Sequence, residues 1–165
     1  MSNGEGSDLT PADPEAVAKE IIDASRYMTL ATADETGLPW ASPVWYAHSD
    51  YRDFFWVSSP EAKHSRNLSA RPELAIVVFD SHAPGAGHAV YMAAAAEQLE
   101  GDELDRGIEI FSSRSEVQGL PRWTPEDVRP PARHRLYRAV AGEQFVLDEG
   151  DRRIRVQAGK RETRR

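Results

Sequence analysis

The middle of the chain is a succession of short extended runs separated by turn residues, and this pattern constrains the fold more than any other feature. The runs are rich in β-branched and aromatic residues, as is typical of strands. Strands that follow one another through short turns favour an antiparallel sheet, and closure into a barrel buries both edges of such a sheet. The predicted strands span residues 28–33, 39–47, 54–58, 74–79 and 89–99, and residues 134–140 and 144–147 form a closing strand or hairpin.

The first two runs form a predicted hairpin with Gly37 in its turn. Pro39 and Pro43 remove backbone donors from the second run, so we expect this strand to lie at a sheet edge or to contain a bulge. Residues 48–50 are predicted to form a polar turn. Residues 74–79 are continuously apolar, which predicts a strand that is buried on both faces.

Three helices are predicted around the strands. Asp13 can cap the first helix, which begins with Pro14 and ends near residue 25. Ser59 can cap the second, with Pro60 in its first turn and its end near residue 70. The third carries Leu104, Ile108 and Phe111 on one face, and one further turn is predicted at residues 124–128.

The length of 165 residues suits one domain with a substantial core. Residues 1–12 are rich in Gly, Ser and acidic residues, which predicts a disordered segment. We expect the domain to span residues 13–157. The remaining residues, 158–165, are predicted to form a basic flexible tail that is solvated rather than bound to a polyanion.

Composition excludes several function classes. The chain has no cysteine, which excludes disulfides and thiolate metal sites and fits a reducing cytoplasm. It shows no leader segment and no apolar run of about 18 residues, so we expect a cytoplasmic protein that does not bind membranes. A net charge of −7 opposes nucleic-acid binding.

The junction between residues 56 and 64 is the strongest local signal for a ligand site, because a strand leads into a helix whose first turn carries hydroxyls and a cation. Free amides and the positive end of the helix dipole favour anions there. Ser58, Ser59, Lys63 and His64 could complete a phosphate site. In the alternative interpretation Ser59 only caps the helix and Lys63 only lies in water.

Residues 42–45 are a second candidate for ligand contact. Ser42, Pro43, Val44 and Trp45 form a proline-interrupted strand whose unpaired backbone groups suit a flat heterocycle with alternating donors and acceptors, such as an isoalloxazine ring. Alternatively, Trp45 belongs to the core or to a dimer interface. The five histidines lack zinc-site spacing, so we expect no metal, and the Walker A, Gly-x-Ser-x-Gly and Gly-x-Gly-x-x-Gly patterns do not occur.

Taken together, these segments resemble the pyridoxamine 5'-phosphate oxidase-like family. The resemblance extends over residues 16–147 and rests on the order and spacing of four segments, which are residues 36–39, residues 55–58 with Lys63 and His64, residues 71–74 and residues 135–138. It implies a mainly β (α+β) fold, an antiparallel split β-barrel of about six or seven strands with flanking helices. It also implies FMN bound at the interface of a homodimer.

By this resemblance the cofactor-binding residues are Ser42, Pro43, Val44, Trp45, Val57, Ser58, Ser59, Lys63, His64 and Arg135, and no side chain needs to be catalytic. Lys63 and His64 occupy the positions of the family's arginine and lysine. Tyr137 replaces a substrate-contacting histidine, which puts pyridoxamine oxidation in doubt.

The expected function is therefore that of an FMN-binding flavoprotein oxidoreductase with a small-molecule substrate or electron acceptor. The alternatives are a deazaflavin-dependent reductase, a non-enzymatic flavin or haem module with His48 or His88 as axial ligand, and a structural dimer with an empty site.

Overall fold

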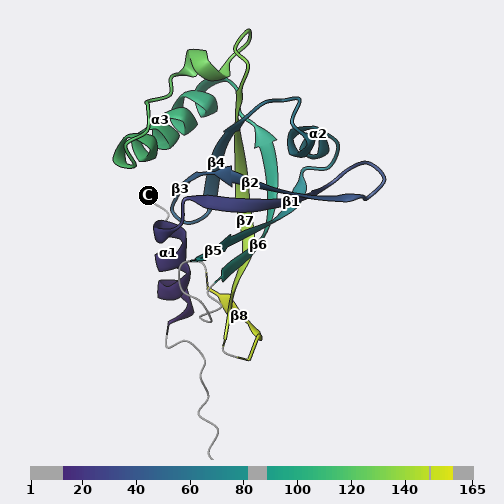
Figure 1. Cartoon of the computed structure of the whole chain (residues 1–165), viewed down its shortest axis with the longest axis vertical. Coiled ribbons are helices and arrows are strands. Elements are labelled where there is room, and N and C mark those ends of the chain that lie inside the picture. Colours follow the sequence, from purple (N-terminus) through teal and green to yellow (C-terminus); the bar gives the residue numbers. More distant parts are fainter. Residues whose placement is uncertain (1–12, 82–88, 149, 158–165) are drawn as a thin grey trace, which may run out of the picture.

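The computed structural model describes residues 13–81, 89–148 and 150–157, and eight antiparallel strands of this part form one sheet that curls into a split barrel (Figure 1). The strand order is β2-β1-β5-β6-β7-β4-β3, and β8 pairs with β7. β2 and β3 lie at opposite ends of this order but are separated in the chain only by Tyr46, so the chain itself links the two edges. The strands are β1 Tyr27–Ala33, β2 Pro39–Trp45, β3 Ala47–Ser49, β4 Asp53–Ser58, β5 Glu73–Phe79, β6 Ala89–Gln98, β7 Arg135–Leu147 and β8 Arg153–Val156.

Three α-helices surround the barrel (Figure 1). α1 (Pro14–Ala24) packs against β5, β6, β7 and β8, and α2 (Lys63–Ala70) lies over the β1–β2 hairpin. α3 (Gly101–Val117) lies outside the sheet on β3, β4 and β7, next to a short 3-10 helix, η1 (Pro125–Val128). The expected cap of α1 is confirmed, because the Asp13 carboxylate accepts from the amides of Glu15 and Ala16.

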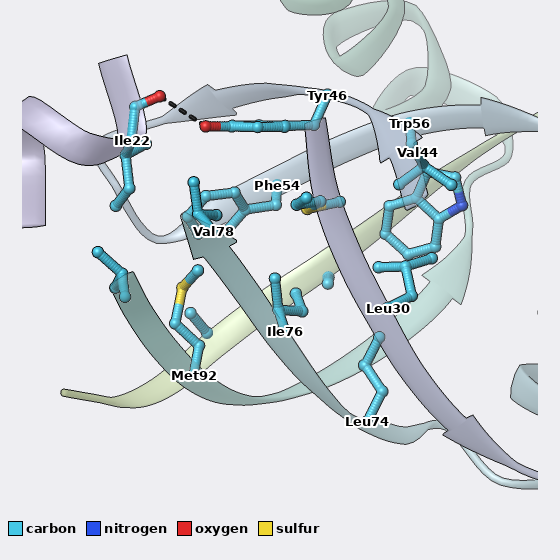
Figure 2. Close-up of a cluster of buried hydrophobic side chains, with 14 of the residues drawn as sticks. Ile22, Leu30, Val44, Tyr46, Phe54, Trp56, Leu74, Ile76, Val78 and Met92 are labelled. Atoms are coloured by element: carbon cyan, nitrogen blue, oxygen red, sulfur yellow. Dashed lines mark hydrogen bonds between the residues drawn. The ribbon is translucent and has the colours of Figure 1, made fainter. Parts of the chain in front are cut away.

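Two hydrophobic clusters make up the core. The first fills the barrel, where Leu30, Ile76 and Trp56 are fully buried and the Tyr46 hydroxyl donates to the carbonyl of Ile22 at 2.6 Å (Figure 2). The second lies between the sheet and α3 and includes Phe111. Alternate residues of β4 enter different clusters, so this strand separates the two.

Two predictions, one about a strand and one about a turn, were wrong. β5 is not buried on both faces, because Leu74, Ile76 and Val78 are buried while Ala75 and Phe79 are exposed. The rest of its outer face consists of Glu73, which is exposed, and Val77, which is half-buried. The predicted turn at residues 48–50 is also wrong, because residues 47–49 form β3, and the turn follows at Asp50 and Tyr51, which both have positive φ angles.

The last two strands are β7 and β8. Residues 135–147 form one strand, which is the first of the two predicted alternatives, with Gly142 inside it. Arg153 and Arg155 belong to β8, because the alternating Ile154 and Val156 turn towards the core. These additional short strands bring the count to eight. The segments 1–12 and 158–165, predicted to be disordered, lie outside the described residues.

Candidate functional site

The barrel is split between β2 and β4, and each strand has a free edge at this place. Among the described strands, β2 pairs with β1 only. β3 ends its pairing with β4 at Phe55, so residues 56–58 have a strand partner only on the β7 side within the described chain. Backbone donors and acceptors along both edges are therefore available to a ligand.

His64 connects the two edges. Its Nδ1 lies 3.2 Å from the Ser42 hydroxyl of β2, and its Nε2 lies 2.8 Å from the Ser58 hydroxyl of β4. The residue is only 9% exposed, and burial lowers the pKa of its imidazole. A neutral imidazole has one donor and one acceptor, so it can bond to both hydroxyls. The structure thus brings Ser42, Ser58 and His64 together.

The start of α2 is not the one that the sequence predicted. The helix begins at Lys63, and no side chain caps it. The Ser59 hydroxyl accepts from the amide of Glu61 and its carbonyl from the amide of Ala62, so Ser59 stabilises a turn that precedes the helix. The predicted cap was wrong because this local turn takes up Ser59 first. The first-turn amides of α2 consequently have no side-chain acceptor, and Lys63 stands beside them.

Lys63 faces the turn of the β1–β2 hairpin. Its Nζ lies 3.4 Å from Oδ2 of Asp34. Oδ1 of Asp34 accepts from the Thr36 hydroxyl at 2.7 Å, from the Thr36 amide at 2.9 Å and from the Leu38 amide at 3.0 Å. These bonds, the hydroxyl of Thr36 first, lower the pKa of Asp34 to about 2. The sequence interpretation missed Asp34, although Asp followed by Thr before a turn glycine is typical of such side-chain turns.

An open cavity of about 240 Å³ lies between this turn and one face of α2. The turn contributes residues 34–36, and the helix contributes residues one turn apart, namely Lys63, Arg66, Asn67 and Ala70. Asn67 is buried and donates from Nδ2 to the Thr32 hydroxyl at 3.0 Å, which fixes the helix on β1. The cavity is therefore lined by charged side chains, and the helix face that lines it is held on β1.

Arg135 lies at the start of β7, directly opposite Ser58 in the pairing of β4 with β7. Its Nη1 donates to the carbonyls of Ala132 and His134, both at 2.6 Å. The guanidinium is thus held beside the split by backbone acceptors, with further donors available for a ligand.

The predicted ring-contacting residues lie on two faces of the sheet. Val44 is buried in the barrel. It lies on the same face of β2 as Ser42, because residues two apart in a strand point to one side. Pro43 is exposed on the outer face, and Trp45 on that face donates from Nε1 to the Gln118 side chain at 2.8 Å. Val57 packs against the second cluster. Strand alternation could have predicted this division from the sequence.

Aromatic side chains continue the outer face, and the sequence interpretation did not single out Trp123 among them. The Trp45 ring meets Phe111 edge-on at 4.7 Å, and Trp123 meets His134 edge-on at 5.7 Å. Trp123 lies in the connection that follows α3. No local sequence pattern predicts that the chain returns here to β4 and β7. Arg135 adjoins His134 in the chain, so this aromatic wall reaches the split.

His48, a candidate axial ligand for haem, is engaged elsewhere. Its Nε2 lies 2.9 Å from the Asp23 carboxylate, and its side chain is 11% exposed. Burial lowers its pKa more strongly than Asp23 raises it. Haem ligation through Nε2 would have to break this contact between α1 and β3. His88, the other candidate, lies outside the described residues.

In the described ranges, no three His, Asp or Glu side chains are grouped so that they could hold a metal ion. None of the helices described is long and apolar enough to cross a membrane.

Comparison with known proteins gives a consistent family. Residues 14–146 match the sequence model of the family described as Pyridoxamine 5'-phosphate oxidase. The pyridoxine/pyridoxamine 5'-phosphate oxidase of Azorhizobium caulinodans is 31% identical over 103 residues, which are 62% of this chain and 46% of that enzyme. The match therefore spans less than half the length of this curated relative.

Solved structures share the fold at low sequence identity. The heme binding protein from Mycobacterium smegmatis has a TM-score of 0.67 at 23% identity, covering 86% of this chain and 57% of the other. HutZ, the heme storage protein from Vibrio cholerae, has a TM-score of 0.65 at 21% identity, covering 81% and 94%. An F420 reductase has a TM-score of 0.57 at 17% identity, covering 76% and 94%. At these identities the likeness shows the fold alone.

Proposed function

The chain belongs to the pyridoxamine 5'-phosphate oxidase family, and from this premise we propose that it is a homodimeric, FMN-binding oxidoreductase with a small-molecule substrate. When bound, FMN supplies the electron transfer, and the protein supplies position and electrostatics. The cysteine-free composition supports a cytoplasmic location.

The observation that carries the proposal is the uncapped start of α2 beside Lys63. Amides without acceptors and the helix dipole favour a phosphate there, and Lys63 adds a full charge. Ser58 lies on the neighbouring edge and Arg135 opposite it. Burial favours the neutral form of His64, and its ring nitrogens hold the Ser42 and Ser58 hydroxyls in place, so it acts by positioning rather than by charge.

The ring of the flavin would lie along the split. Residues 42–45 of β2 have backbone groups free on the side away from β1, and the exposed Pro43 keeps this edge from pairing with another strand. An isoalloxazine ring offers alternating donors and acceptors to such an edge. In this arrangement Trp45 supports the edge from the outer face through its bond to Gln118.

The outer face of the sheet supports a homodimer. Ala41, Ala31, Ala75 and Ala93 lie side by side across β2, β1, β5 and β6, and all four are exposed. Contiguous exposed apolar residues of this kind mark interaction surfaces. The next row contains Pro43, so the face reaches the strand that we assign to the ring, in keeping with a cofactor between subunits.

Two alternatives retain specific support. The F420 reductase with the same fold favours a deazaflavin coenzyme, which would require the same anion site. The heme binding and heme storage proteins favour a non-enzymatic haem module. The engagement of His48 with Asp23 weighs against the second alternative in this chain.

The absorption spectrum of freshly purified protein and a fluorescence titration with FMN test the proposal. We expect flavin bands or quenching of added FMN. Lys63→Ala should weaken FMN binding by about 1–3 kcal/mol, because it removes a charge-assisted contact. Lys19→Ala is the matched control, since this lysine on α1 pairs with Glu15 at 2.7 Å.

Each other outcome has a distinct meaning. A deazaflavin spectrum or a haem Soret band would support the respective alternative. Colourless protein that does not quench FMN would contradict the proposal. Reduction of the bound flavin by NADPH, followed by reoxidation with acceptors, would separate an enzyme from a storage module.

A further inference from the structure

The β1–β2 turn presents a fixed carboxylate to the lysine of the proposed phosphate site. Oδ1 of Asp34 is occupied by the Thr36 and Leu38 donors of its own turn. The Asp34 amide donates to the Leu38 carbonyl at 3.1 Å, and the Gly37 amide donates to the Asp34 carbonyl at 2.9 Å. The turn therefore orients the carboxylate before any contact with α2, and Oδ2 is left for Lys63.

The same turn is tied to the other end of α2. Nη2 of Arg71, the residue after the helix, donates to the carbonyl of Glu35 at 3.0 Å. The turn is thus connected to both ends of α2, through Asp34 and Lys63 at its start and through Arg71 after its end. Lys63 differs, because its ammonium stands on a flexible four-carbon stem and is one-third exposed.

We propose that Asp34 competes with the bound anion for Lys63 and thereby limits how tightly the site holds a phosphorylated ligand. This inference rests on the proposed function. A phosphate at the start of α2 draws the ammonium away from a carboxylate that cannot follow it, so each binding event breaks the Lys63–Asp34 pair.

Two further observations agree with this role. The low pKa of Asp34 keeps it charged throughout the physiological pH range, so the competition is constant and not a switch. Burial lowers the pKa of His64 and disfavours its charged form, so this residue does not replace the charge of Lys63. The result is a site that exchanges FMN with the surrounding pool instead of holding it permanently.

The test compares FMN with riboflavin, which has the same ring without the phosphate, in fluorescence titrations of the full chain. Asp34→Asn retains an oxygen for the turn but removes the charge. We expect FMN to bind about three- to tenfold more tightly to this variant and riboflavin to bind unchanged. In a Lys63→Met background Asp34→Asn should give no gain.

Glu35→Gln is the matched control, because it removes one negative charge from the same turn. Within the part of the chain that the structure describes, the Glu35 carboxylate has no ion pair, and only its carbonyl is used. We expect FMN affinity within about twofold of the wild type. Asp34→Ser, which also keeps an acceptor, replaces Asp34→Asn if that variant does not fold.

Equal FMN affinity in the wild type and the Asp34 variant would overturn the inference and leave the proposed function standing. A gain that is the same for riboflavin, or that persists without Lys63, would overturn it as well, because the effect would not pass through phosphate and lysine. If neither the wild type nor any variant binds FMN, the proposed function fails, and the inference fails with it.

Discussion

His64 is the residue at which this chain departs most clearly from the charge pattern expected of a phosphate site. It lies buried between two serine hydroxyls, and burial disfavours its charged form. In the proposed site the ammonium of Lys63, the amides of α2 and the guanidinium of Arg135 then supply the attraction for an anion. A residue predicted to contact the ligand thus has a second role, which is to hold together the two edges of the split.

The lowered pKa of His64 predicts how stability depends on pH. The unfolded imidazole titrates near 6.5, and the folded one titrates lower. Below 6.5 the unfolded state therefore binds more protons, and the free energy of unfolding falls as the pH falls. His48 acts in the same direction. Each histidine contributes a slope of at most about 1.4 kcal/mol per pH unit.

Urea unfolding of the wild type and of His64→Gln, from about pH 8 to about pH 5, measures this slope. Gln can still bond to the serines but does not titrate, so we expect a shallower fall. An identical slope in both proteins would show that His64 does not titrate as its burial implies.

At the scale of elements, α3 depends on a glycine for its close approach to the sheet. A Cβ at Gly107 would lie 2.9 Å from Leu99, 3.1 Å from Leu136 and 3.1 Å from Phe55. These side chains come from three different segments, so they cannot all move aside without loss of packing. The position of α3 in turn supports Trp45 and the outer wall of the split.

Gly107→Ala should lower the free energy of unfolding by about 1–3 kcal/mol, although alanine is the better helix former. Arg106→Ala, at an exposed position of the same helix, should change stability by less than about 0.5 kcal/mol. Chemical denaturation of both variants measures the difference. A gain in stability from Gly107→Ala would show that the space above the sheet is larger than the structure indicates.

The elements could be predicted from the sequence wherever a local signal was sufficient. Asp13 and Pro14 mark the start of α1, and Gly37 marks the first hairpin, which has its positive φ there. Local signals failed where two structures compete for one residue, as with Ser59. They also failed at β5. Its outer face is mostly apolar, so the sequence does not distinguish it from a strand that is buried on both faces.

At the scale of the whole molecule, the exposed row of alanines on the outer face is the surface through which we propose that two subunits meet. Ala75 lies in the middle of the row, between Ala31 and Ala93. We expect Ala75→Arg to convert the homodimer to a monomer with its fold retained, because a buried unpaired charge at the interface is costly. Ser113→Arg on the exposed side of α3 is the control.

Sedimentation equilibrium gives the mass of each variant, and circular dichroism checks the fold. If Ala75→Arg has the same mass as the wild type, the row is not the interface. Weaker FMN binding by the monomeric variant would support a cofactor between subunits. Unchanged FMN binding would place the whole site within one chain.

The site could be predicted in part from the sequence, because the junction of strand and helix is local. Ser58, Lys63 and His64 do lie together, but the partners that decide their chemistry come from far away in the chain. Asp34 reaches Lys63 only because the β1–β2 hairpin folds under α2. Ser42 reaches His64 only because the barrel is split at β2.

The most direct test of the central claim is a two-dimensional amide NMR spectrum of the protein during titration with FMN. If the phosphate binds at the start of α2, the amides of residues 63–65 shift most strongly and saturate together with the flavin fluorescence. Inorganic phosphate at higher concentration should shift the same amides. Shifts confined to other regions, such as the neighbourhood of His48, or no shift at residues 63–65 at saturating FMN, would contradict the account.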